Sequence, residues 1–206
     1  SINSFIKPIV SLAEKNSKQI INNHLSKKEK YTFAYKELSQ KLGIKEIKRI
    51  DAFDISHQYM KQGVGSCVVF AESGASKKDY RLFNIPDEIT GNDIASMEHV
   101  IYRRLKYYED DKPDILLIDG GKTQLNFTNK ILKDFGVENI LVLAIAKGKG
   151  RIRAMETIYT NDGILEIDTN SDSFKLLNEL RDESHRFAIT ASRKKIRKTN
   201  NYSILD

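Results

Sequence analysis

Two short, continuously apolar segments on either side of a helical pattern restrict the fold of this chain more than any other feature. The segments are PDILLID, residues 113–119, and NILVLAIAK, residues 139–147. Between them lies KTQLNFTNKILKDFG, a helical pattern that Gly136 ends. Strands without polar alternation are covered on both faces, which is typical of parallel strands joined by a helix. The sequence therefore predicts a buried parallel pair at the centre of an α/β domain.

Three further strand-like segments precede this pair. They span residues 44–54, 63–73 and 77–85, and their short connections predict an antiparallel meander. A helix is predicted at 92–109, a hairpin at 154–167 with its turn at 161–163, and a long final helix with Ser171 or Ser173 as its N-cap. The expected fold is α/β, with a mixed sheet of three antiparallel strands followed by parallel strands and helices on its flanks.

The first 43 residues have a different texture. Apolar residues recur at helical spacing in residues 4–25 and again in residues 28–43, where Gly43 is expected to end the second helix. No catalytic grouping occurs there. We therefore expect residues 1–43 to form a helical linker or docking arm, and residues 44–198 to form the main domain.

Composition limits the classes of function. The 206 residues include 34 Lys and Arg against 28 Asp and Glu, and the net charge of +6 favours a polyanionic partner without proving one. The one cysteine, Cys67, excludes a disulfide framework and a cysteine metal cage, and we interpret it as a buried, inert thiol. No apolar run approaches the roughly 20 residues of a membrane span. Since the first residues also lack a secretory pattern, we expect a cytoplasmic protein without a membrane partner.

Asp54 and Asp119 each end a predicted strand and are the main candidates for chemistry. In a sheet of this order the first strand and the first parallel strand can lie side by side at the centre, so both aspartates would meet at one edge, where α/β sheets place ligands. Two such carboxylates can hold a divalent cation together with phosphate and water. A site of this kind activates water for phosphodiester cleavage.

Other interpretations of Asp119 depend on the residues around it. The stretch LIDGGKT is not a phosphate-binding P-loop, because that motif needs a glycine where Leu116 stands. Gly120 and Gly121 allow backbone or substrate to approach closely. The alternative that Asp119 only caps the helix beginning near Lys122 stays open, as does the alternative that Asp54 is an ordinary turn residue.

His185 lies in RDESHRFAITASRKKIRK, residues 181–198, between two acidic residues and a basic run. The final helix is expected to pack beside the sheet near the two aspartates. His185 then either reaches the site or forms a salt bridge at the surface with neighbours such as Asp182. His57, three residues after Asp54, is either a ligand or phosphate contact or an exposed turn residue.

Asp93 precedes the helix expected at 92–109, with Asn92 beside it. It is either a further acid of the site or part of a helix cap. His24 and His99 occur without a carboxylate constellation, and we interpret both as structural. The helix at 92–109 also interleaves aromatic with basic side chains, which fits a nucleic-acid face and an ordinary amphipathic helix equally well; these residues are Tyr102, Arg103, Arg104, Lys106, Tyr107 and Tyr108.

Several of these stretches, in this order and at this spacing, resemble the C-terminal nuclease half of UvrC, the incision subunit of the bacterial UvrABC excinuclease. The resemblance covers residues 44 to about 206 and rests on the stretches IDAFDISH, SCVVF, YRLFNI, LLIDGGKTQL, LAIAKG and RDESHRFAIT. It implies a ribonuclease-H-like fold that cuts the damaged strand on the 5′ side of a lesion, using Mg²⁺ or Mn²⁺. It also implies a metal-binding and catalytic triad of Asp54, Asp119 and His185, with Asp93 as a further suspected acid.

The sequence departs from the family pattern at two places. The family usually has GDDYAAM where this chain has GNDIASM, so Asn92 and Ile94 replace an acid and an aromatic residue, whereas Asp93 is kept. A glutamate is usual where Asp51 stands. The resemblance also implies that residues 199–206 begin a linker to a helix-hairpin-helix domain that this chain does not contain.

The resemblance implies damaged double-stranded DNA as substrate and the helicase subunit UvrB as a partner, reached through regions largely outside this chain. It implies a cytoplasmic, nucleoid-associated bacterial protein. The basic residues are expected to contact phosphates without reading bases; we assign DNA binding to Lys122, Arg186, Arg193, Lys194, Lys195, Arg197 and Lys198. Two alternatives are a non-catalytic nucleic-acid-binding module of the same fold and a ribonuclease or transposase-type nuclease.

Overall fold

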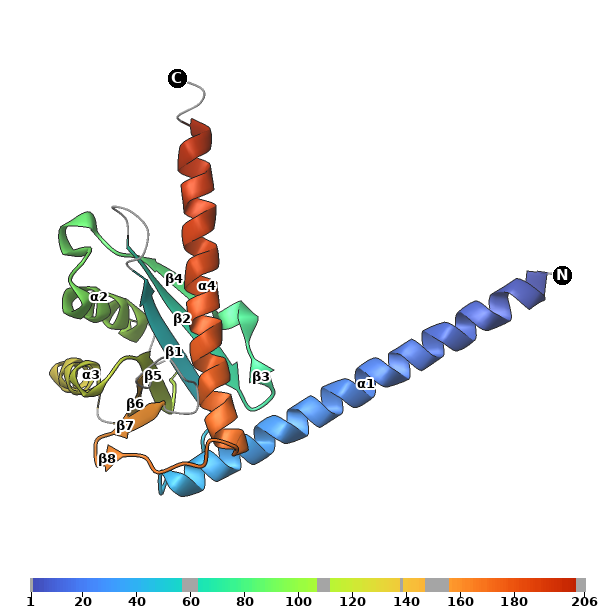
Figure 1. Cartoon of the computed structure of the whole chain (residues 1–206), viewed down its shortest axis with the longest axis horizontal. Helices are drawn as coiled ribbons and strands as arrows, with labels where there is room; N and C mark the ends of the chain where they lie inside the picture. The colour runs from blue at the N-terminus through green and yellow to red at the C-terminus, as the bar shows by residue number, and fades with distance from the viewer. Residues whose placement is uncertain (1, 57–62, 107–111, 138, 147–155, 203–206) are drawn as a thin grey trace.

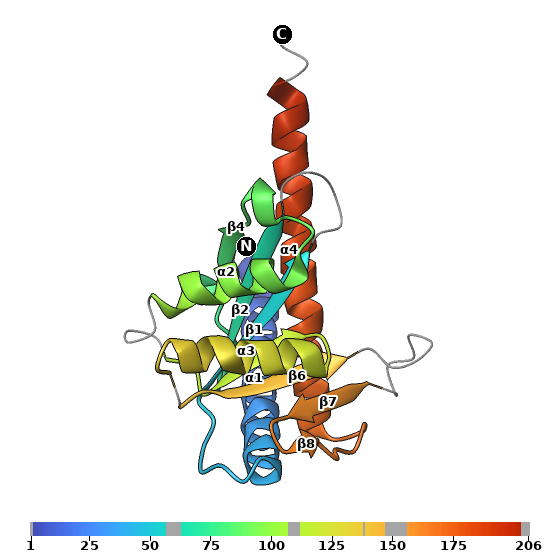
Figure 2. The same cartoon turned by 90° about the vertical axis from the view of Figure 1, so that its left-hand side faces the viewer.

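The computed structural model describes residues 2–56, 63–106, 112–137, 139–146 and 156–202, with the side chains of 2–8, 21–25, 56 and 194–202 excepted. One mixed sheet forms the centre of the molecule, and helices cover both of its faces (Figure 1, Figure 2). The strands are β1 (Arg49–Ser56), β2 (Val64–Ala71), β3 (Gly74–Ala75), β4 (Arg81–Asn84), β5 (Ile115–Asp119), β6 (Leu141–Ala146), β7 (Thr157–Thr160) and β8 (Gly163–Ile164). The helices are α1 (Ile2–Lys41), α2 (Asp93–Leu105), α3 (Lys122–Asp134) and α4 (Asp172–Tyr202), with short 3-10 turns at Lys77–Asp79 and Asp87–Ile89.

The sheet has the order β3-β2-β1-β5-β6-β7-β8, and β4 also pairs with β2. β1 is antiparallel to β2 and parallel to β5, and β5 is parallel to β6. The predicted mixed sheet is therefore confirmed, including the central contact between the first strand and the first parallel strand. The predicted hairpin is also confirmed, because β7 and β8 pair antiparallel around Asn161 and Asp162.

The strand expected at 77–85 is shorter than predicted. Lys77–Asp79 form a 3-10 turn, and only Arg81–Asn84 pair with β2. The Ser76 hydroxyl donates a hydrogen bond to the Asp79 carboxylate. The backbone nitrogens of Asp79 and Tyr80 donate to the carbonyl oxygens of Ser76 and Lys77, at 3.0 and 3.4 Å, so these groups bond within the turn and strand pairing begins only after it.

The two faces of the sheet carry separate hydrophobic cores. On β1, Ile50 and Ala52 belong to the core under α4 and the C-terminal part of α1, whereas Phe53 belongs to the core under α2 and α3. On β5, Ile115 and Leu117 face α4, and Leu116 and Ile118 face the other side. Because side chains alternate along a strand, this assignment also fixes which way the polar residues at the strand ends point.

The N-terminal segment is one continuous helix, so the prediction of two helices was wrong. α1 has 40 residues and extends away from the domain (Figure 1). Neither glycine nor proline interrupts residues 26–30, SKKEK, and lysine and glutamate are good helix formers. Residues 9–20 and 26–30 are exposed, whereas four residues near the C-terminal end are buried against the domain: Tyr31, Ala34, Tyr35 and Leu38.

The C-terminal part of α1 also ties down the start of α4. Glu37 accepts hydrogen bonds from the backbone nitrogen and the hydroxyl of Ser173, at 2.9 and 2.8 Å. The Ser171 hydroxyl accepts from the backbone nitrogen of Phe174, so Ser171 is the N-cap of the two predicted candidates. α4 continues through Tyr202, past the boundary predicted at residue 198. The three domain limits drawn from the sequence stay predictions.

Candidate active site at the ends of the central strands

Asp54 and Asp119 come together through the parallel pairing of β1 and β5. The register aligns Phe53 with Ile118, so the next residues, Asp54 and Asp119, stand side by side where the pairing of the two central strands ends. Asp119 is the last residue of β5, and Asp54 is two residues before the end of β1. Because side chains alternate along a strand, both carboxylates point to the same face as Ala52 and Leu117, the face covered by α4. The predicted meeting of two carboxylates at one sheet edge agrees with this register.

His185 approaches the same place from α4. Its Nδ1 lies 3.6 Å from Oδ2 of Asp54, and the side chains are 41% and 9% exposed respectively. Nδ1 is shielded from solvent and makes no hydrogen bond to any described residue. Glu156 and Asp182 each form an ion pair with Arg181. The described contacts therefore place His185 at Asp54 rather than in a surface ion pair with its sequence neighbours.

The two glycines that follow Asp119 stand at the start of α3. Gly121 occupies the N-cap position, and its backbone nitrogen donates to Oε1 of Gln124 at 3.0 Å. A Cβ atom on Gly120 would lie 2.8 Å from Cγ of Gln124, so this glycine permits the close approach predicted for the turn. The alternative that Asp119 is the cap of this helix was wrong.

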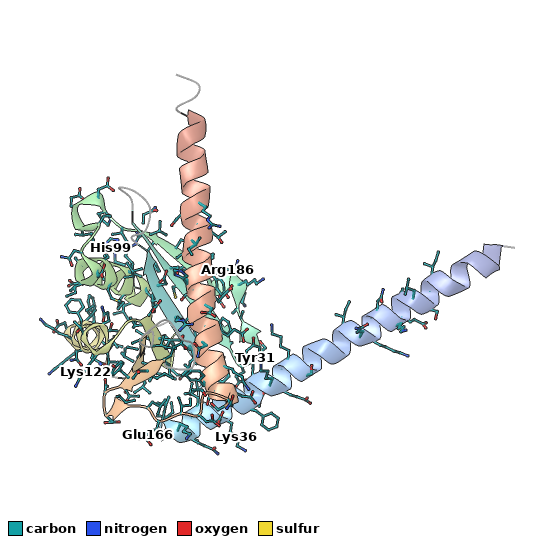
Figure 3. All side chains as sticks on the ribbon, viewed as in Figure 1. Tyr31, Lys36, His99, Lys122, Glu166 and Arg186 are labelled. Atoms are coloured by element: carbon teal, nitrogen blue, oxygen red, sulfur yellow. The ribbon has the colours of Figure 1, made fainter. Side chains whose placement is uncertain are left out.

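Asp93 is the first residue of α2 and is exposed. The cap is formed by Asn92, whose Oδ1 accepts a hydrogen bond from the backbone nitrogen of Ala95 at 3.1 Å. A catalytic role for Asp93 stays a prediction. His57 lies outside the described residues, as does the side chain of His24, and the structural role of His99 (Figure 3) also stays a prediction.

The basic residues assigned to DNA lie on two helices. Lys122 begins α3, and Arg193 on α4 is exposed, whereas the side chains of Lys194, Lys195, Arg197 and Lys198 lie outside the described part of the chain. Arg186 is also exposed (Figure 3), but it donates two hydrogen bonds to Glu183, from Nε at 2.6 Å and Nη2 at 2.7 Å. These bonds hold the pKa of Glu183 below its ordinary value. Arg186 would therefore meet a phosphate as part of an ion pair.

Among the described residues of α2, the interleaved aromatic and basic side chains do not all face outward. Arg104 is buried and donates to Oδ2 of Asp51 at 2.9 Å. Tyr102 packs edge-on against Phe135 of the α3 terminus, with ring centroids 5.0 Å apart. Tyr107 and Tyr108 lie outside the described residues. The described part of α2 thus has the pattern of an amphipathic helix.

Three contacts near the site were not anticipated from the sequence. Asp51 is fully buried on the face of the sheet covered by α2, opposite to the site, and accepts hydrogen bonds from Arg49 and Arg104. Arg181 forms a buried ion pair with Glu156, and the Ser66 hydroxyl donates to the backbone of α4. A charged residue among apolar neighbours, as at Asp51, was the available signal. Arg49 is two residues away, but Arg104 is 53 residues away in sequence, so the pattern did not identify the buried network.

Within the described residues, no three His, Cys, Asp or Glu side chains are grouped so that they could hold a metal ion by themselves. The predicted triad is brought together in part: His185 is next to Asp54, and Asp119 ends the adjoining strand. In the part of the chain that the structure describes, no helix has the length and apolar character needed to cross a membrane.

A mixed sheet of this order, with two aspartates at the ends of its central parallel strands and a long helix across them, defines an α/β domain of the ribonuclease-H-like class. The model of the UvrC RNase H endonuclease domain matches residues 39–189. The chain belongs to this family, and the family resemblance predicted from its sequence motifs is confirmed.

Curated relatives agree with this assignment. The chain is 38% identical to UvrABC system protein C of Pseudomonas putida over 201 residues, which are 95% of this chain and 33% of that protein. It is 39% identical to the protein of the same name from Acinetobacter baumannii over 198 residues, 96% of this chain and 32% of that protein. The chain therefore spans about a third of the length of these relatives.

Among solved structures, the catalytic domain of human endonuclease V is similar with a TM-score of 0.41 and 14% identity, over 75% of this chain and 85% of that one.

Proposed function

We propose that this chain is the catalytic part of a DNA endonuclease that hydrolyses a phosphodiester bond on the 5′ side of a lesion in bacterial nucleotide excision repair. The observation that carries the proposal is the approach of His185 to Asp54, beside Asp119, at the ends of the central strands of a UvrC-family domain. Membership of the family supports the class of reaction, and the site supplies residues suited to it.

A divalent cation, Mg²⁺ or Mn²⁺, fits the residues at this place, with Asp54, Asp119 and His185 as the groups that would hold it. Two ligand atoms at about 2.1 Å from one cation can be at most about 4.2 Å apart, so the 3.6 Å between Nδ1 of His185 and Oδ2 of Asp54 is compatible with a shared ion. The shielded Nδ1 makes no hydrogen bond among the described residues, which also suits a ligand position. When bound, such a cation lowers the pKa of water and stabilises the charge that develops on the leaving oxygen.

The residues of this chain would divide the remaining work. Asp54 and Asp119 would supply the negative charge that holds the cation. His185 either completes the ligand set as a neutral imidazole, without adding negative charge, or exchanges a proton at the phosphate as a general acid or base. Lys122, Arg193 and the basic residues that follow Arg193 would bind phosphates of the DNA backbone, which requires no particular base sequence.

The cellular setting belongs to the same proposal. The relatives are named as part of the UvrABC system and are about three times as long as this chain. We infer that the domain acts on damaged duplex DNA within such a longer protein, and that contact with a helicase subunit involves regions largely outside this chain. A cytoplasmic, nucleoid-associated location follows from a DNA substrate.

The test is metal-dependent cleavage by this chain, alone and exchanged for the matching third of the Pseudomonas putida relative. A duplex with one defined lesion and a 5′ end label on the damaged strand locates the cut. We expect a cut on the 5′ side of the lesion in Mg²⁺ or Mn²⁺ and no cut after chelation with EDTA. Cleavage that continues in EDTA would contradict the metal assignment, and a well-folded exchange protein that makes no 5′ cut would contradict the endonuclease assignment.

His185→Gln should lower the rate of this cleavage by about 10²- to 10⁴-fold, the range typical of a general acid or base, and a comparable loss is expected if His185 is a ligand. Calorimetric titration with Mn²⁺ separates the two roles. Weaker Mn²⁺ binding identifies a ligand, whereas unchanged binding with lost cleavage identifies proton transfer or positioning. His99→Gln, on α2, is the matched control. A wild-type rate for His185→Gln would remove this histidine from the site.

A further inference from the structure

Ser66 is fully buried on β2, directly across the strand pair from Asp54. Residues opposite each other in an antiparallel pair point to the same face of the sheet, so the Ser66 side chain also points toward α4. Its hydroxyl donates a hydrogen bond of 2.9 Å to the backbone carbonyl oxygen of Ser184. Ser184 is fully buried and immediately precedes His185. One buried hydrogen bond thus connects the strand position beside Asp54 to the helix position beside His185.

The apolar contacts of α4 do not fix this alignment by themselves. α4 packs on the sheet through Leu177, Leu180 and Ala188 among others, and hydrophobic contacts are not directional. One residue along a helix corresponds to an axial shift of about 1.5 Å. A shift of that size would change the 3.6 Å between His185 and Asp54 substantially. A hydrogen bond depends steeply on distance and angle, and therefore selects one position of the helix.

A second polar contact acts one turn earlier on the same helix. Arg181 forms an ion pair with Glu156, and the two side chains are only 6% and 4% exposed. Glu156 immediately precedes β7, which lies toward the opposite edge of the sheet from β2. This ion pair therefore connects α4 to that edge. The Tyr80 hydroxyl also donates to Glu183 of α4 at 3.1 Å. Among the described polar contacts between α4 and the sheet, the Ser66 bond ends closest to His185 in sequence, on the adjacent residue.

We propose that Ser66 is a positioning residue of the candidate site: by donating to the carbonyl oxygen of Ser184, its hydroxyl holds α4 in the position that places the His185 imidazole against Asp54. This inference rests on the proposed function as far as catalysis is concerned. The placement of the imidazole does not require a metal or a substrate. It can therefore be tested separately from catalysis.

The decisive comparison is Ser66→Ala against Ser184→Ala. Both substitutions remove a fully buried hydroxyl, but the Ser184 hydroxyl donates to the carbonyl oxygen of Arg181 within the same helix, at 2.8 Å. Ser184→Ala therefore keeps the tie between strand and helix, because the Ser66 bond ends on the Ser184 backbone. Ser66→Cys adds a variant of nearly the same volume with a weaker donor.

In metal-free protein, the ¹⁵N chemical shifts of the His185 imidazole report its surroundings, with the signals assigned through His185→Gln. We expect these shifts to change in Ser66→Ala, to change less in Ser66→Cys, and to stay at the wild-type values in Ser184→Ala. With Mn²⁺ and DNA, Ser66→Ala should lower kcat and Mn²⁺ affinity by about 10-fold, the lower end of the effect of groups that orient a ligand, while KM for DNA stays constant.

Unchanged imidazole shifts in Ser66→Ala would overturn the inference, whatever the protein does to DNA. Altered shifts in Ser66→Ala and Ser184→Ala alike would also overturn it, because loss of any buried hydroxyl would then be the cause. If the wild-type protein binds no Mn²⁺ and cuts no DNA, the proposed function fails. The imidazole shifts would still show whether Ser66 positions His185.

Discussion

Asp54→Asn and Asp119→Asn should each lower the rate of metal-dependent cleavage by more than about 100-fold, because groups that only orient a metal ligand already contribute about 10- to 100-fold. Each substitution keeps the shape of the side chain and removes the negative charge that the proposed cation needs. Asp119 ends β5, and Asp54 is buried two residues before the end of β1. Because the Asn side chains have the same shape, the fold should persist, and circular dichroism should show the wild-type spectrum. The rate is measured on the end-labelled duplex at saturating Mn²⁺.

Asp162→Asn is the matched control for this pair. Asp162 is an exposed aspartate in the turn between β7 and β8, so the same change of charge is made away from the central strands. We expect its rate to equal that of the wild-type chain. If Asp54→Asn or Asp119→Asn cuts as fast as the control, that aspartate does not belong to the catalytic group.

Asp51→Ala should destabilise the domain by about 3–5 kcal/mol, the usual cost of breaking a buried ion pair by removing one partner. Asp51 is fully buried and accepts hydrogen bonds from Nε of Arg49 at 2.7 Å and Nε of Arg104 at 2.9 Å. Its loss takes away the carboxylate that both guanidinium groups contact. Because a domain is stabilised by only about 5–15 kcal/mol in total, urea denaturation should show a much lower midpoint.

The triple variant Arg49→Met, Asp51→Val, Arg104→Met should recover much of this loss, since replacing all members of a buried charged group by apolar residues is often close to neutral. Glu46→Gln is the surface control. It breaks the exposed contact between Glu46 and Lys48, and it should leave the urea midpoint unchanged. A midpoint for Asp51→Ala as high as that of this control would contradict a stabilising role for the buried network.

The sequence predicted best the elements that depend on local patterns, such as apolar runs and helix-ending glycines. The apolar runs at 113–119 and 139–147 became the buried strands β5 and β6, and Gly136 ends α3 with a positive φ of 68°, as a C-terminal glycine should. α1 was mispredicted as two helices because a polar stretch of good helix formers carries no stop signal. The strand at 77–85 was shortened by the 3-10 turn at Lys77–Asp79, whose backbone groups bond within the turn.

The candidate site was also predicted only in part from the sequence. Asp54, Asp119 and His185 were identified from strand ends and from motifs of the family, which are properties of the sequence. Which of them touch was decided by long-range packing: the register of β1 against β5 brings the aspartates level, and the crossing of α4 over the sheet brings His185 to Asp54. Gly121 rather than Asp119 took the cap of α3 because Gln124 could reach its backbone nitrogen.

By itself the sequence determined the α/β class, the order of the strands and the identity of the acidic and imidazole groups, because hydrophobic periodicity and residue chemistry act locally. Only the tertiary structure decided which partners these groups meet. Arg104 turned inward to Asp51 instead of outward to DNA, and Ser66 met the backbone next to His185, 118 residues away in sequence. Such contacts depend on how α2 and α4 pack on the two faces of one sheet, and no local pattern in the chain encodes that packing.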